Sequence, residues 1–304
     1  MSSEWTDLPR GIGRVVTAMV TPFDADAALD RDGASRLARH LVDSGTDTVL
    51  VNGTTGESPT LHFDEVIGLV GAVRTAVGGD ANVMVGTGTN STATTVDATA
   101  RAEGLGADAV LVVTPYYNRP DQSGLIEHFT AAAAATSLPV VLYDIPFRTG
   151  REIEVSTLVT LSEVENIVGV KDATANLGKV ADVLAATADA PGGFGVWCGS
   201  DEANLAELAV GASGVISVSA HLAGPEIAEM VDVFPTNPSR ARELHLRCLP
   251  LHRALFAQPS PAPLKGVLAS LGLPAGPVRL PLTAADTPTI EAAIAAHQRL
   301  VSLR

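Results

Sequence analysis

The sequence predicts an α/β fold, a (β/α)8 TIM barrel with a C-terminal helical appendage. Short apolar runs rich in valine and isoleucine recur as far as residue 218, and helical stretches separate most of them. Strands form such continuous apolar runs when helices cover both faces of their sheet. Strands that alternate with helices build a parallel sheet, and eight such strands close into a barrel.

The predicted strands are short and rich in β-branched residues, which separates them from helices of similar hydropathy. They are residues 15–20, 48–52, 82–86, 109–114, 139–145, 167–171, 194–198 and 214–218. The predicted helices between them include residues 61–76, 91–104, 124–136, 154–161, 177–186 and 202–210. A doubly wound open sheet is the alternative. It usually carries a glycine-rich phosphate loop after its first strand, whereas this chain continues with Thr21-Pro22-Phe23-Asp24.

The pattern changes after the last predicted strand. Helical stretches follow at about residues 224–233, 239–256, 263–271 and 287–300, and prolines separate several of them. We therefore expect two regions, a catalytic barrel over residues 1–232 and a helical region over residues 233–304.

The composition excludes several classes of function. The chain has 304 residues and a formal net charge of -14, so neither nucleic acid nor an anionic membrane is an expected partner. Two cysteines form no disulfide framework, which fits a reducing cytoplasm. Residues 1–7 lack the pattern of a signal peptide, and no apolar run is long enough to span a membrane. We expect a cytoplasmic protein.

Lys171 is the first candidate for chemistry. It lies in an apolar run that otherwise reads as a buried strand, and the chain has only three lysines, Lys171, Lys179 and Lys265. Burial disfavours the ammonium form and lowers the pKa of a lysine. The neutral amine is a nucleophile that forms a Schiff base with a carbonyl carbon. The competing interpretation is a lysine that ends a strand and points to solvent or to a carboxylate.

Polar and glycine-rich segments follow most predicted strands, at the end where barrel enzymes place their sites. All three tyrosines, Tyr116, Tyr117 and Tyr143, lie at the ends of the fourth and fifth strands. A phenol both donates and accepts a proton, so these tyrosines suit a proton relay. Arg148 follows the fifth strand and is suited to clamp a carboxylate, although a surface salt bridge explains it equally well. Asp144 alternates away from Tyr143 and is interpreted as structural.

The segment after the second strand is Gly53-Thr54-Thr55-Gly56-Glu57. Glycines let backbone N–H groups converge on an anion, and the two hydroxyls add donors. The segment therefore predicts a site for a carboxylate or a small phosphate. A tight turn into a helix, capped by Ser58 or Thr60, explains the same residues without a ligand.

No metal site and no nucleotide site are expected. None of the seven histidines forms a ligand pair with a carboxylate at metal spacing, and the chain has neither a G-x-G-x-x-G nor a P-loop motif. Schiff-base chemistry is therefore better supported than metal-dependent aldol chemistry. Asp201 and Glu202 are interpreted as the start of a helix, where acidic groups suit the helix dipole.

Taken together, these segments resemble the dihydrodipicolinate synthase and N-acetylneuraminate lyase family of class I aldolases. The resemblance runs nearly end to end, through residues 17–23, 53–58, 114–120, 143–150, 169–174, 214–219, 263–265 and 278–282. The paired threonines and Arg148-Thr149-Gly150 are similar to the synthase branch. Sialic acid lyases usually have Ser-Thr in the first motif and lack the arginine. The resemblance implies a lyase that needs no cofactor beyond a covalent imine.

The resemblance also implies catalytic roles. Lys171 would form the imine with pyruvate, and Thr54 and Thr55 would hold the pyruvate carboxylate. Tyr143 would shuttle protons at the imine carbon and would be linked through Thr54 to Tyr117. In the family that second tyrosine reaches in from a neighbouring subunit, so a homotetramer built from tight dimers is implied.

Three further residues gain substrate-binding roles from the resemblance. Arg148 would bind the carboxylate of aspartate semialdehyde, and Gly199 and Ile216 would line the pyruvate pocket. The implied reaction condenses pyruvate with this aldehyde to the heterocyclic precursor of diaminopimelate and lysine. The alternatives are a sister aldolase that acts on a sugar acid or another 2-keto acid, and an inactive family member that serves as a binding or regulatory protein.

One departure from the family concerns regulation. Synthases that lysine inhibits are expected to carry imidazoles after the first motif and a carboxylate after the asparagine of the third strand. The matching residues here are Phe63, Val66 and Thr94, although Asn90 and Tyr116 are retained. We therefore expect weak or no inhibition by lysine, and inhibition by sub-millimolar lysine in a steady-state assay would contradict this.

Overall fold

The computed structural model describes residues 12–304, so the N-terminal residues considered for a signal peptide lie outside the described part. The described strands close into a parallel barrel in sequence order, which confirms the predicted fold class. They are β1 (Val15–Ala18), β2 (Thr48–Val51), β3 (Asn82–Gly86), β4 (Ala109–Val113), β5 (Val140–Asp144), β6 (Ile167–Asp172), β7 (Gly195–Cys198) and β8 (Gly214–Ser217). Each predicted strand overlaps one of these.

Helices follow most of the strands, and further helices follow β8. They are α1 (Arg31–Asp43), α2 (Phe63–Val77), α3 (Thr92–Ala102), α4 (Gln122–Ala133), α5 (Pro146–Thr149), α6 (Val155–Ser162), α7 (Leu177–Ala186), α8 (Asn204–Val210), α9 (Ala220–Val233), α10 (Pro238–Leu255), α11 (Ala262–Ser270) and α12 (Thr287–Val301). The sequence analysis missed α1 and the single turn α5. No helix within residues 12–304 is long and apolar enough to cross a membrane.

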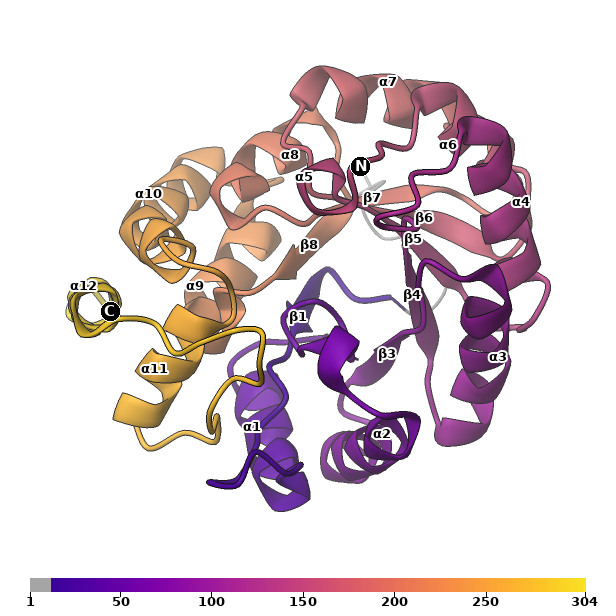
Figure 1. Ribbon diagram of the computed structural model, residues 1–304. Helices are drawn as coiled ribbons and strands as arrows, with labels where there is room; N and C mark the ends of the chain where they lie inside the picture. The colour runs from indigo at the N-terminus through magenta and orange to yellow at the C-terminus, as the bar shows by residue number, and fades with distance from the viewer. Residues whose placement is uncertain (1–11) are drawn as a thin grey trace. The chain divides into compact units, whose positions relative to one another are not determined.

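The chain divides into two compact units. The first comprises residues 82–216 together with the segment that ends at residue 16. It contains the neighbouring strands β3 to β7, and α3, α4, α6 and α7 lie outside them (Figure 1). In the register of β5 and β6, Tyr143 pairs with Lys171 and Asp144 pairs with Asp172. Because successive residues of a strand point to opposite faces, Tyr143 and Lys171 share one face of the sheet and the two aspartates share the other.

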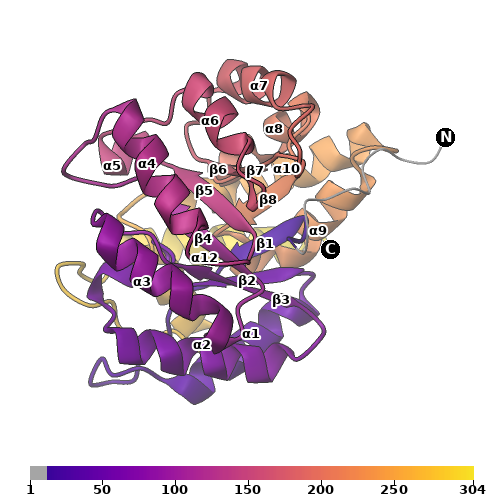
Figure 2. The ribbon, with the colours of Figure 1, turned by 90° about the vertical axis from the view of Figure 1, so that its right-hand side faces the viewer.

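The second unit comprises residues 17–81 and 217–304. Helices α1 and α2 lie side by side in it (Figure 2). The four C-terminal stretches that the sequence predicts as helical are observed as α9 to α12, and α10 packs against both α9 and α12. The proposed division of the chain at residue 233 stays a prediction.

Candidate active site

All three lysines of the chain are buried. Their exposed fractions are 5% for Lys171, 7% for Lys179 and 3% for Lys265. A buried ammonium group is costly unless a carboxylate pairs with it. Lys179 forms ion pairs with Asp144 and Glu152, and the Nζ of Lys265 lies 2.6 Å from Oε1 of Glu57. Lys171 forms no ion pair with any described residue, which sets it apart from the other two.

The environment of Lys171 favours the neutral amine. Burial lowers its pKa from 10.5 to about 8, although the nearby Asp201 and Cys198 act in the opposite direction. The Nζ atom lies 4.2 Å from the centroid of the Tyr143 ring. Near neutral pH, a larger fraction of this amine is therefore uncharged than in an ordinary lysine, and the uncharged amine can attack a carbonyl carbon. The interpretation of Lys171 as a strand end that points to solvent or to a carboxylate does not fit this geometry.

Gly199, the residue after β7, makes room for the lysine side chain. A Cβ atom at this position would lie 2.9 Å from Cε and 3.0 Å from Cγ of Lys171, and 2.8 Å from the carbonyl oxygen of Asp172. The N–H of Gly199 donates to that same carbonyl over 2.6 Å. The absence of a side chain at Gly199 is thus required for the observed path of Lys171. Ile216, in β8, is fully buried.

Arg148 and Tyr117, two residues that the sequence singles out, are exposed in the first unit. Arg148 lies in α5, and its Cζ atom is 5.3 Å from the ring centroid of Phe147. The Arg148 side chain is exposed and forms no ion pair within residues 12–304, so the salt-bridge interpretation does not account for it. Tyr117 is 90% exposed and has a φ of 73°. A tyrosine that is so exposed in a strained backbone conformation has no packing role within its own chain.

The Gly-Thr-Thr-Gly-Glu segment lies in the second unit and forms a tight turn. The N–H groups of residues 56–58 donate to the carbonyls of Gly53 and Thr54. The N–H groups of Thr54 and Thr55 have no hydrogen-bond partner among the described residues. A short 3-10 turn, Ser58–Thr60, follows, and α2 is capped at His62 rather than at Ser58 or Thr60. The turn therefore satisfies part of its own backbone and leaves two adjacent donors for a ligand.

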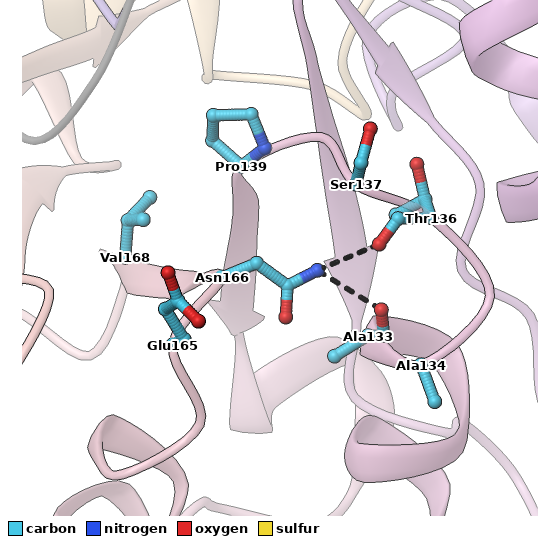
Figure 3. Close-up of a pocket in the computed structure, with 8 residues that line it drawn as sticks. All are labelled: Ala133, Ala134, Thr136, Ser137, Pro139, Glu165, Asn166 and Val168. Atoms are coloured by element: carbon cyan, nitrogen blue, oxygen red, sulfur yellow. Dashed lines mark hydrogen bonds between the residues drawn. The ribbon is translucent and has the colours of Figure 1, made fainter.

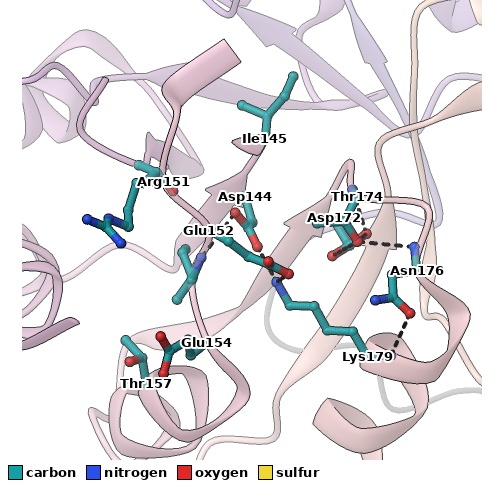
Figure 4. A network of polar contacts seen from close by, with 12 residues as sticks. Asp144, Ile145, Arg151, Glu152, Glu154, Thr157, Asp172, Thr174, Asn176 and Lys179 are labelled. Atoms are coloured by element: carbon teal, nitrogen blue, oxygen red, sulfur yellow. Dashed lines mark hydrogen bonds and ion pairs between the residues drawn. The ribbon is translucent and has the colours of Figure 1, made fainter. Parts of the chain in front are cut away.

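An ionic network, in which Lys179 and Asp144 are buried and Glu152 is exposed, lies on the opposite face of β5 and β6 from Tyr143 and Lys171. Figure 4 shows Lys179 between the carboxylates of Asp144 and Glu152, and the Oε1 atom of Glu152 is 2.9 Å from Nζ. Burial lowers the pKa of Lys179, but the attraction of both carboxylates outweighs it, so the net pKa is raised. Asp172 accepts hydrogen bonds from the backbone and the hydroxyl of Thr174. The structural interpretation of Asp144 agrees with this arrangement.

Comparison with known proteins places the chain in a family. The model of the Dihydrodipicolinate synthetase family matches residues 11–297. The chain belongs to this family. The chain is therefore an enzyme, a lyase of the class I aldolase type.

Individual relatives of the family cover nearly the whole chain. A 4-hydroxy-tetrahydrodipicolinate synthase from Moorella thermoacetica is 51% identical over 90% of this chain and 93% of that protein. A second, from Streptomyces coelicolor, is 49% identical over 89% of each. Among solved structures, the synthase from Cyanidioschyzon merolae, determined with lysine bound, has a TM-score of 0.92 and 41% identity and covers 95% of this chain and 98% of that one.

Sequence reasoning missed two buried acidic residues, Asp201 and Glu207, of this dihydrodipicolinate synthetase family member. Asp201 is buried in a 3-10 turn ahead of α8, and its charge raises the pKa of Lys171. Glu207 of α8 is fully buried, and burial and the charge of Asp172 raise its pKa to about 8. The expectation that Asp201 and Glu202 begin a helix is correct only for a 3-10 turn, because α8 itself starts at Asn204. Their position directly after β7 was the only available signal.

A hollow in the first unit is explained by the hydrogen bonds that end a helix. It has a volume of about 470 Å³ and is lined by residues between α4 and β5 and at the start of β6. Figure 3 shows the Asn166 side chain in it, where Nδ2 donates to the carbonyls of Ala133 and Thr136 over 2.9 and 3.0 Å. These bonds satisfy carbonyls at the end of α4. Within residues 12–304, no group of three or more His, Cys, Asp or Glu side chains is arranged to hold a metal ion.

Proposed function

We propose that the chain condenses pyruvate with L-aspartate 4-semialdehyde to 4-hydroxy-tetrahydrodipicolinate, a step of diaminopimelate and lysine biosynthesis. The observation that carries the proposal is the buried Lys171, which has no carboxylate partner among the described residues and lies against Tyr143. The same reaction gives its name to relatives that are up to 51% identical to this chain. A catalytically inactive binding protein would have no reason to retain an unpaired buried lysine, which is costly to fold.

The chemistry begins with the neutral amine of Lys171. Nζ attacks the carbonyl carbon of pyruvate, the oxygen leaves as water, and an imine remains. Once protonated, the imine nitrogen withdraws electrons, so the methyl carbon loses a proton and becomes an enamine carbon that attacks the aldehyde. The amino group of the second substrate then adds to the imine carbon, closes the ring and releases Lys171. Tyr143 moves the protons of these steps, and general acid–base catalysis of this kind contributes about 10²–10⁴-fold.

The remaining residues bind and orient the substrates in this proposal. Thr54 and Thr55 hold the pyruvate carboxylate with the N–H groups that their turn leaves free. Gly199 and Ile216 line the pocket around the methyl and carbonyl carbons. Arg148, exposed and without an ion pair in the described chain, binds the carboxylate of the aldehyde. No cofactor is required, because the imine nitrogen itself is the electron sink.

Tyr117 supports the proposal of an assembly. Its ring is 90% exposed in this chain, and we propose that it completes the proton relay of a neighbouring subunit, through Thr54, in a homotetramer made of two dimers. The free, buried cysteines, Cys198 and Cys248, suit the cytoplasm that we propose as its location. Weak or absent inhibition by lysine also stays a prediction, since Thr94 offers no carboxylate to a cationic effector.

Trapping the intermediate tests the Schiff-base step. The protein is incubated with pyruvate, borohydride is added, and the intact mass is measured and the modified peptide is sequenced. We expect one reduced pyruvate adduct on Lys171 and none on Lys179 or Lys265, because each of those two buried amines is paired with a carboxylate. A protein that gains no adduct, or gains it elsewhere, would refute the proposal.

Turnover with different aldehydes tests the second substrate. Aspartate semialdehyde and a panel of sugar aldehydes are compared at equal pyruvate concentration. We expect turnover with aspartate semialdehyde and a loss of affinity for it in Arg148→Ala. Preference for a sugar aldehyde would instead support the alternative, a sister aldolase. In that enzyme Lys171 would still form the imine, but Arg148 would not bind the carboxylate of aspartate semialdehyde.

A further inference from the structure

Glu57 adopts a backbone conformation that the rest of the structure must hold in place. It directly follows the Thr54-Thr55-Gly56 segment, has a φ of 58° and is 2% exposed. A residue with a side chain in the left-handed region costs about 1–3 kcal/mol and persists only where its surroundings enforce it. The buried carboxylate adds its own desolvation cost. Both costs fall on the residue that ends the turn carrying the two threonines.

Two residues of the C-terminal helical region enforce this conformation. The Nζ of Lys265, in α11, lies 2.6 Å from Oε1 of Glu57, and the backbone N–H of Arg279 donates to Oε2 over 2.8 Å. Lys265 also donates to the carbonyl of Pro277 over 2.8 Å. Burial lowers the pKa of Lys265, and Glu57 offsets this effect in part. The carboxylate of Glu57 is thus held at both oxygens by groups that are distant in sequence.

The Arg279 side chain fixes the same segment to its neighbours. Its guanidinium donates to both oxygens of Glu65 and to the carbonyl of Ala27. Both cations also lie over the ring of Phe23, whose centroid is 4.2 Å from Nζ of Lys265 and 4.1 Å from Cζ of Arg279. A Cβ atom at Gly276 would lie 1.9 Å from the Phe23 carbonyl oxygen, so the backbone approaches as closely as glycine permits. We name Glu57, Lys265, Arg279 and Phe23 the Glu57 anchor.

Stability alone does not explain the Glu57 anchor. Replacing a buried ion pair by apolar groups of similar volume is often neutral or stabilising, so a buried pair is weak evidence of a stabilising role. The Glu57 anchor combines such a pair with a strained backbone conformation, and it ends the turn whose two free N–H groups belong to Thr54 and Thr55. We infer that the Glu57 anchor serves to fix the position of these two N–H groups.

We propose that Glu57 is a positioning residue for the carboxylate of the keto acid. Lys265 and the backbone of Arg279 hold Glu57, Glu57 fixes the turn, and the turn aims the N–H groups of Thr54 and Thr55 at the carboxylate. The helical region thereby sets the affinity of the site for a charged over a neutral ketone. The inference rests on the proposed function, since it takes the imine on Lys171 as the intermediate.

The rate of reductive trapping on Lys171 tests this inference with two ketones. Pyruvate carries the carboxylate and acetone lacks it, so the ratio of their second-order trapping rate constants measures the contribution of the carboxylate. We expect Glu57→Gln and Lys265→Met to lower this ratio about tenfold, which corresponds to about 1.4 kcal/mol, mainly by raising the KM for pyruvate. Acetone trapping should stay near the wild-type rate. Lys265→Arg keeps the ion pair and should keep most of the ratio.

The controls separate this inference from general destabilisation and from failure of the proposed function. Glu226→Gln removes the partner of Arg304, an ion pair of 2.6 Å in the same unit, and should leave the ratio unchanged. An equal loss with both ketones, or an unchanged ratio in folded Glu57→Gln or Lys265→Met protein, would overturn the positioning role. If Glu57→Gln does not fold, the comparison of the ratio in Lys265→Met with that in Lys265→Arg tests the positioning role. A wild-type protein that gains no pyruvate adduct would instead refute the proposed function.

Discussion

Lys171 and Tyr143 are register partners on β6 and β5, and the Lys171 Nζ lies 4.2 Å from the centroid of the Tyr143 ring. Strand pairing, rather than a flexible loop, therefore fixes the amine beside the phenol. The same register places Asp144 opposite Asp172 on the other face of the sheet, where Lys179 joins Asp144 to Glu152. One face of this strand pair thus carries the unpaired lysine, and the other carries the aspartate that pairs with Lys179 of α7.

Removal of the phenol should separate imine formation from turnover. In Tyr143→Phe the ring keeps its packing against Lys171 but can no longer move a proton. We expect kcat to fall by about 10²–10⁴-fold, the usual contribution of a general acid–base group, while borohydride still traps pyruvate on Lys171. Steady-state kinetics and intact mass measure the two effects. Unchanged kcat would exclude Tyr143 from the proton relay.

The pKa of Lys171 should govern the rate of imine formation. Burial lowers that pKa to about 8, so below pH 8 the ammonium form dominates and the trapping rate should rise tenfold per pH unit. Above pH 8 the amine is neutral, and the rate should level off. Trapping with cyanoborohydride at several pH values measures this profile. A rate that keeps rising toward pH 10.5, the ordinary value for lysine, would show that burial does not control the amine.

Gly199 offers a steric test of the same lysine. In Gly199→Ala the new Cβ would lie 2.9 Å from Cε of Lys171 and 2.8 Å from the Asp172 carbonyl oxygen, which is backbone and cannot easily move. We expect a loss of about 1–3 kcal/mol in the free energy of unfolding and slower trapping of pyruvate. Gly71→Ala is the control, since its Cβ would have no atom within 4 Å. Equal trapping rates in the two variants would contradict the steric role.

The strands were predictable because each is buried on both faces and therefore apolar throughout. Helix α1 was not, since its first turn contains Asp32 and Gly33, which are weak helix formers. It forms because Asp30 caps it, accepting from the N–H of Gly33 over 2.7 Å, and because Leu37 and Leu41 are buried. Tertiary packing thus decides what local propensity leaves open.

The candidate site was only partly predictable. A lone lysine in an apolar strand pointed to Lys171 from local sequence, and strand ends pointed to the tyrosines. The partners of Lys179 and Lys265 had no such signal, because Asp144 and Glu57 lie far from them along the chain. Only the folded structure shows that two of the three buried lysines form ion pairs with carboxylates. This contrast identifies the third, Lys171, as the candidate nucleophile.

Loss of the Lys179 charge should destabilise the fold. Lys179→Met leaves the carboxylate of Asp144, which is fully buried, without its cation. Removing one partner of a buried ion pair costs about 3–5 kcal/mol, and urea unfolding would measure it. The double variant Asp144→Asn with Lys179→Met removes both charges and should recover much of the loss, while Lys179→Arg should lose less than Lys179→Met. If Lys179→Met and the double variant were equally stable, the unpaired charge of Asp144 would not be the cause of the lost stability.

Glu207 should make the stability of the protein depend on pH. Burial and the charge of Asp172 raise its pKa from 4.5 to about 8, and neither of its oxygens has a conventional hydrogen-bond partner in the described chain. Between those two pH values the folded protein holds a proton that the unfolded chain has released. The free energy of unfolding therefore falls as pH rises through this window, by an amount on the order of a few kcal/mol.

Glu207→Gln removes this titration and should flatten the fall in stability between pH 4.5 and pH 8. Urea unfolding at a series of pH values, compared with the wild type, measures the difference. Glu163→Gln is the control, because that side chain is exposed and should leave the curve in place. As pH rises, the free energy of unfolding of Glu207→Gln should therefore increase relative to that of the wild type. Parallel curves would mean that Glu207 is already ionised in the folded protein.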